Sequence, residues 1–197
     1  MHVTPLLAAS CAIVGGLLWA ADELTPRLGQ MFQAKIVLVQ QQAEARPEAR
    51  LTTTFLESEL NSYLRFNAAE LLPTGLTEPV MTLIGHGRVT ARAVVDLDVV
   101  RQKQSTGNWF DPTSYLTGTL PVTATGTIVA EHGEGRFAFE RVEVSGVPVP
   151  KALLAQMVNF FTRTADTPQG ASIDDTFELP ARIRQIVVDA GRFSVIQ

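Results

Sequence analysis

Residues 80–147 alternate apolar and polar side chains in the way that antiparallel strands with one buried face do. Between Val89 and Leu97 every second residue is apolar, and the same period returns between Leu120 and Ala130. A period of two over this length predicts strands whose apolar side chains share one face. That face must lie against another part of the chain or against a ligand.

Glycine-rich turns divide these strands into two long hairpins. The first turn lies at Gly85–Arg88 and the second at Glu131–Gly135. Beyond the second turn the apolar period continues through Phe137 and Phe139, and at Val142 it shifts by one residue. We therefore expect an antiparallel sheet with one change of register near its last long strand.

Two amphipathic helices flank the hairpins and are the candidates to cover the apolar face. The first follows a short strand at 50–55, and its apolar face carries Leu56, Leu60, Tyr63, Leu64 and Leu71. The second begins at Pro150, which suits a first helical turn. A last hairpin is expected over residues 183–196. The elements together predict an α+β fold.

The first 21 residues contain no charged side chain, and residues 6–21 are almost wholly apolar. A helix over this stretch would be about 31 Å long, close to the thickness of a bilayer core. An uncleaved anchor helix, a cleaved signal peptide and lipidation at Cys11 remain open. All three place the rest of the chain outside the cytoplasm. We expect a protein anchored in the inner membrane and facing the periplasm or extracytoplasmic side, or a secreted protein if the N-terminus is cleaved.

The predicted organisation has three parts: a signal or anchor helix at 1–21, a helical or linker spacer at 22–49, and one α+β domain at 50–197. Within the spacer, Ile36–Val39 fits either a helix or a strand. The net charge of -4 and the absence of a Lys/Arg cluster argue against nucleic acid as a partner. The chain length of 197 residues allows one domain with a good core plus an anchor.

The sequence contains no evident catalytic constellation. Glu57 and Glu59 lie near the start of the first helix, where carboxylates interact favourably with exposed N–H groups. Thr54 and Glu57 also have the spacing of a capping box. His86 and His132 fall at hairpin tips, where imidazole is usually solvated. We expect a non-enzymatic protein with no metal and no cofactor.

Short motifs in the domain resemble a family of bacterial envelope proteins. Residues 57–64 read Glu-Ser-Glu-Leu-Asn-Ser-Tyr-Leu at a helix start, and Leu179–Val188 leads into the last hairpin. With the N-terminal membrane signal, the long hairpins and the Pro-initiated helix, this order resembles the LmeA-like and YceB/YpmS-like proteins, which resemble half of a TULIP (tubular lipid-binding) domain. The resemblance covers roughly residues 51–197. It implies a long, curved antiparallel sheet wrapped around amphipathic helices, an apolar groove for acyl chains and no catalytic residues.

The leading hypothesis is non-catalytic binding of a lipid or another hydrophobic small molecule in an apolar groove between sheet and helix. Small Ala and Gly side chains alternate with Val and Ile on the strands, which leaves room that a filled core would not need. The helix after Pro150 is rich in Met and Phe. The predicted walls of the groove are Val89, Ala91, Ala93, Val95, Leu120, Val122, Ile128, Phe137, Phe139, Leu153, Met157, Phe160 and Phe161.

Two other functions remain open. A structural or scaffolding subunit of a cell-envelope complex would have a filled core and a protein partner. An envelope hydrolase would need a cleft that joins Glu57, Glu59 or Asp96 to a histidine, and the spacing of these residues does not indicate one.

Overall fold

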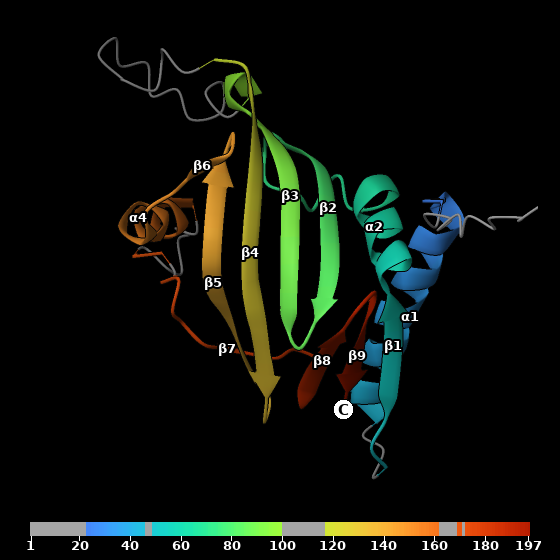
Figure 1. The fold of residues 1–197 in the computed structure, drawn as a ribbon. Coiled ribbons are helices and arrows are strands. Elements are labelled where there is room, and N and C mark those ends of the chain that lie inside the picture. Colours follow the sequence, from blue (N-terminus) through green and yellow to red (C-terminus); the bar gives the residue numbers. More distant parts are fainter. Residues whose placement is uncertain (1–22, 46–48, 100–116, 162–168, 171) are drawn as a thin grey trace, which may run out of the picture.

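The computed structural model describes residues 23–45, 49–99, 117–161, 169–170 and 172–197. It has an α+β fold with antiparallel sheets, which confirms the predicted class (Figure 1). The predicted signal or anchor helix at 1–21 lies outside the described residues. Within the described part of the chain, every helix is too short or too polar to cross a bilayer.

In the described part of the chain, the larger sheet has six strands. Four long strands lie in sequence order, namely β2 (Leu76–Gly85), β3 (Arg88–Asp96), β4 (Thr119–Glu131) and β5 (Glu134–Val144). Two short strands, β6 (Val147–Pro148) and β7 (Phe177–Glu178), pair with opposite ends of β5. The two predicted long hairpins are therefore present as β2–β3 and β4–β5.

Both long hairpins close through two residues with positive φ. The φ angles are 54° and 79° at His86 and Gly87, and 57° and 86° at His132 and Gly133. Two consecutive positive φ angles define the type I′ turn, whose twist matches that of the flanking strands. Both histidines are exposed, as expected for hairpin tips.

A β-bulge separates the two ends of the β4–β5 pairing. Arg141 pairs with Thr125, and Phe139 pairs with Gly126, so Glu140 has no partner in this register. One extra residue in a strand returns the side chains beyond it to the original face. The bulge explains the one-residue shift of the apolar period beyond Phe139.

The smaller sheet joins the strand between α1 and α2 to the last hairpin. Its strands are β1 (Thr52–Leu56), β9 (Arg192–Ile196) and β8 (Gln185–Asp189), in that spatial order. The last hairpin is thus present as β8–β9, and the short strand predicted at 50–55 is β1. Figure 1 shows this sheet at the hairpin-turn end of β2 and β3.

The described helices lie on two sides of the larger sheet (Figure 1). Helix α2 (Glu57–Phe66) lies next to β2, and α1 (Pro26–Ala45) packs beside α2 on the side away from β2. Helix α4 (Lys151–Phe161) lies towards β5 and β6.

Helix α1 is part of the folded domain. Phe32 and Val39 are each 6% exposed and pack with Phe55 of β1. The ring centroids of Phe32 and Phe55 are 5.1 Å apart. The residues predicted as a helical or linker spacer, 22–49, therefore contain a helix that contributes to the core, and the alternative strand at Ile36–Val39 does not form.

Candidate functional site

The register of β3 and β4 brings predicted groove residues together on one face. Each predicted residue in the outer half of β3 lies directly opposite an apolar residue of β4, as Ala91 opposite Ala124, Ala93 opposite Val122 and Val95 opposite Leu120. Directly opposed residues on antiparallel strands have their side chains on the same face. All six residues are half-buried. We call these six residues the open face.

The other end of the same face is filled core. Val89 is 1% exposed and clusters with Leu83 of β2 and Val188 of β8. Ile128 and Phe137 pack against this cluster. The prediction that Val89 lines a groove is therefore wrong, because the smaller sheet covers this end of the face. Ile128 and Phe137 are half-buried, so their place in a groove wall stays a prediction. Alternation alone does not indicate how far along a strand such a cover extends.

Two aromatic rings lie between the core cluster and the open face. The Phe137 and Phe139 rings meet edge to face, with centroids 4.5 Å apart and an interplanar angle of 80°. A Cβ atom built on Gly126 would lie 2.5 Å from Cζ of Phe137. The Phe137 ring therefore occupies the space that a side chain at position 126 would need.

The remaining predicted wall residues belong to α4. Leu153 is 49% exposed, and its place in a groove wall stays a prediction. The side chains of Met157, Phe160 and Phe161 lie outside what the structure describes. Strand β6 pairs along the outer edge of β5, so α4 begins beside that edge. In the described part of the structure, α4 has no extensive contact with any strand.

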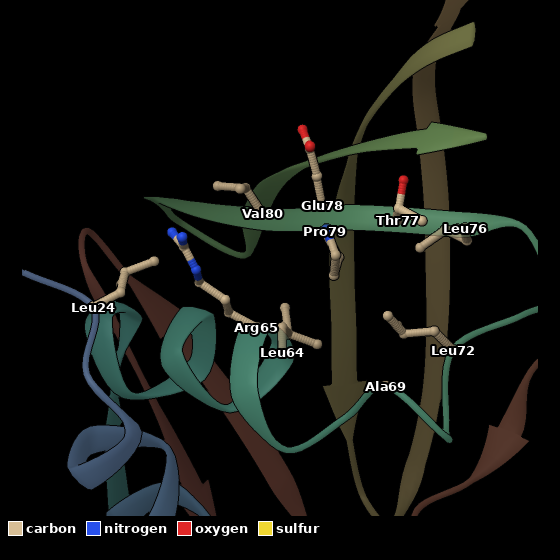
Figure 2. A pocket seen from close by; sticks show the side chains of 10 residues that line it. All are labelled: Leu24, Leu64, Arg65, Ala69, Leu72, Leu76, Thr77, Glu78, Pro79 and Val80. Atoms are coloured by element: carbon tan, nitrogen blue, oxygen red, sulfur yellow. The ribbon is translucent and has the colours of Figure 1, made fainter. Parts of the chain in front are cut away.

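A groove lies at the β2 edge of the open face, between α2 and the first half of β2 (Figure 2). Its volume is about 730 Å³. Most of its lining is apolar, with one cation and one carboxylate among the residues Leu24, Leu64, Arg65, Ala69, Leu72, Leu76, Thr77, Glu78, Pro79 and Val80. Figure 2 shows Leu64 and Leu72 on the helix side and Leu76 and Pro79 on the strand side.

A bulge in β2 joins the groove to the open face. Glu78 and Pro79 together lie opposite the single residue Ala93, and Leu76 pairs with Val95. Glu78 has a φ of 51°, which a non-glycine residue adopts mainly in turns and bulges. The groove and the open face are therefore adjacent parts of one apolar surface.

None of the predicted site residues lines the groove itself. The sequence places Leu64 on the apolar face of the first helix but does not single out Leu76. Their proximity depends on α2 packing against β2, which the spacing of residues does not encode.

The Glu-x-Glu-x-Asn segment of α2 has structural partners. The Glu57 carboxylate accepts a hydrogen bond from the backbone N–H of Leu83 at 2.6 Å. The Asn61 amide accepts from the backbone N–H of Met81 at 2.7 Å and donates to its carbonyl at 2.8 Å. These side chains form hydrogen bonds with backbone groups on the outer edge of β2. Such groups are otherwise left unpaired in an edge strand.

Glu59 connects α2 to α1. Its carboxylate is 1% exposed and lies 2.6 Å and 2.7 Å from Nζ of Lys35. It also accepts a hydrogen bond from the backbone N–H of Leu56 at 3.0 Å. Leu56 is the N-cap residue of α2, so the expected cap pair of Thr54 with Glu57 is wrong. The reason is that β1 continues to Leu56 and the helix begins at residue 57.

The described residues contain no group of three His, Cys, Asp or Glu side chains arranged to hold a metal ion. In comparisons with known proteins, no family model and no curated protein matches this sequence. The resemblance to the LmeA-like and YceB/YpmS-like proteins stays a prediction.

Proposed function

We propose that this protein binds a lipid or another hydrophobic small molecule, without catalysis, on the open face and in the adjoining groove. The observation that carries the proposal is the contrast between the two ends of one apolar face. Val89 is 1% exposed under the smaller sheet, whereas Ala93 and its neighbours are only half-buried. Apolar surface that the protein leaves partly uncovered is stabilised when a ligand removes it from water.

The side chains of the open face are small where a ligand would need room. Ala91, Ala93 and Ala124 occupy positions equivalent to those that Val89 and Ile128 occupy at the filled end. The adjoining groove, at about 730 Å³, falls within the size range of about 300–1,000 Å³ for small-molecule sites. The surface is therefore large enough for an acyl chain or a ligand of similar size.

The contacts of the acidic residues also favour binding over hydrolysis. Glu57 accepts a backbone hydrogen bond and Glu59 is paired with Lys35, so both carboxylates have structural partners. We further propose that residues 1–21 hold the domain at a membrane on its extracytoplasmic side, from which a lipid ligand would come. A protein partner of the cell envelope is the alternative occupant of the same face.

The variant Ala93→Asp tests this proposal. A carboxylate on the open face would have to lose water when an apolar ligand binds, at a cost of several kcal/mol. We expect the displacement of a fluorescent fatty-acid probe to weaken by roughly 100-fold or more. The matched control is Ala138→Asp, the same change at an exposed residue of β5 opposite Thr127.

Thermal melting of both variants establishes that each is folded. Weak binding by Ala93→Asp together with normal binding by Ala138→Asp supports the proposal. Normal probe binding by a folded Ala93→Asp protein would refute the assignment of this face.

A further inference from the structure

We propose that the exposed face of α1 is a dimer interface, at which two copies of this chain pair their α1 helices antiparallel. The inference is independent of the proposed function. Three large apolar side chains of α1, Met31, Val37 and Leu38, are each 43% exposed. Val37 lies on the side of the helix away from the buried Phe32 and Val39, whereas Met31 and Leu38 lie at the edge of that side. Scattered apolar residues are common on protein surfaces, so the pattern of this face is what distinguishes it.

The exposed face of α1 has the spacing of a coiled-coil seam. Steps of three and four residues connect its members, which is the spacing of the a and d positions in a heptad repeat, and its two central members are apolar while the outer four are polar. The residues along this seam are Arg27, Gln30, Ala34, Val37, Gln41 and Glu44, all of them exposed. Met31 and Leu38 flank it on one side. Two helices can pack closely along such a seam, with Ala34 near the centre allowing the backbones to approach.

The charges of the seam select the antiparallel orientation. In an antiparallel pair centred between Lys35 and Ile36, Arg27 lies opposite Glu44 of the partner subunit. By the same symmetry Gln30 meets the partner's Gln41 and Ala34 meets the partner's Val37. A parallel pair would instead place Arg27 against the partner's Arg27 and Glu44 against the partner's Glu44. Like charges across an interface are unfavourable, so only the antiparallel pair is self-complementary.

Arg27 and Glu44 lie at the ends of α1 where their charges interact unfavourably with the helix dipole. The first turn of α1 contains Arg27 and no acidic residue, and its last turn contains Glu44 and no basic residue. The helix dipole favours the reverse arrangement. An antiparallel neighbour supplies an opposite charge and an opposite dipole at each end. The only other charged side chain between these two residues is Lys35, which pairs with Glu59 on the buried side.

Charge reversal tests this interface on the full chain in mild detergent, with sedimentation equilibrium as the measurement. Arg27→Glu or Glu44→Arg alone changes both symmetric ion pairs into like-charge pairs. We expect each single variant to raise the dimer Kd roughly tenfold. The double variant Arg27→Glu/Glu44→Arg restores opposite charges, so its Kd should return to within roughly threefold of the parent value.

A second pair of variants tests the apolar centre. Val37→Asp places a charge in the central layer and should abolish the dimer at concentrations where the parent chain is paired. Val129→Asp is the matched control, since Val129 is 37% exposed on β4, away from α1. A chain that is monomeric at every concentration would overturn the proposal. So would a dimer that is insensitive to Val37→Asp, or a double variant no tighter than the single ones.

Discussion

The ion pair between Lys35 of α1 and Glu59 of α2 holds the two helices together, and substitutions at this pair test how much it contributes to stability. The Glu59 side chain is 1% exposed, and the Lys35 side chain is 28% exposed. Replacing Lys35 by Met keeps most of the aliphatic stem and removes the charge. The Glu59 carboxylate would then be buried with the backbone N–H of Leu56 as its remaining hydrogen-bond donor.

The expected cost follows from leaving a charge unpaired in the interior. Removing one partner of a buried ion pair costs about 3–5 kcal/mol. Because Lys35 is partly exposed and solvent weakens the pair, we expect Lys35→Met to lower the free energy of unfolding by about 3 kcal/mol. Glu59→Gln keeps an oxygen acceptor for Leu56 and should cost less, about 1–2 kcal/mol.

Urea denaturation followed by circular dichroism measures these costs on the parent chain, both single variants and the double variant. The double variant contains no buried unpaired carboxylate, so it should be no less stable than Lys35→Met alone. This corresponds to a coupling energy of about 1–2 kcal/mol. A loss below about 1 kcal/mol for Lys35→Met, or simple additivity in the double variant, would refute this account of the pair.

Two further variants test the contacts around the sheet. Asn61→Leu removes both side-chain partners of the Met81 backbone and should cost about 2–4 kcal/mol in the same urea titration, so a loss below about 1 kcal/mol would contradict this role. Gly126→Val forces a side chain into the space of the Phe137 ring and should cost about 1–3 kcal/mol. That cost lowers Tm by several degrees in a melting experiment, and an unchanged Tm would contradict the close packing around position 126.

The hairpins and their register could be predicted from sequence because their signals are local. Alternation fixes which side chains share a face, and the glycines at positions 87 and 133 supply the positive φ that each type I′ turn requires. Even the bulge at Glu140 was visible, as a one-residue shift in the apolar period.

The division of the apolar face into a filled and an open end could not be predicted in this way. Val89 and Ala93 occupy equivalent positions in the alternation of β3. What distinguishes them is Val188, which comes from a strand about a hundred residues further along the chain. Non-local contacts of this kind leave no mark on the local pattern.

The hydrogen-bond partners of the α2 side chains could not be predicted from sequence, for a related reason. Glu57 and Asn61 are four residues apart, which predicts that they share one face of the helix. Their partners are backbone groups of Leu83 and Met81, and a backbone group carries no sequence signal. From sequence alone, Glu57 therefore suggested only a helix cap.

Native mass spectrometry with organic extraction tests the central claim most directly. The full chain and the Ala93→Asp and Ala138→Asp variants would be purified without added lipid and released from detergent in the gas phase. The account predicts a lipid-sized bound mass on the parent chain and on Ala138→Asp, freed on denaturation, and none on Ala93→Asp. A folded parent chain with no bound mass, or an equal lipid load on Ala93→Asp, would contradict it.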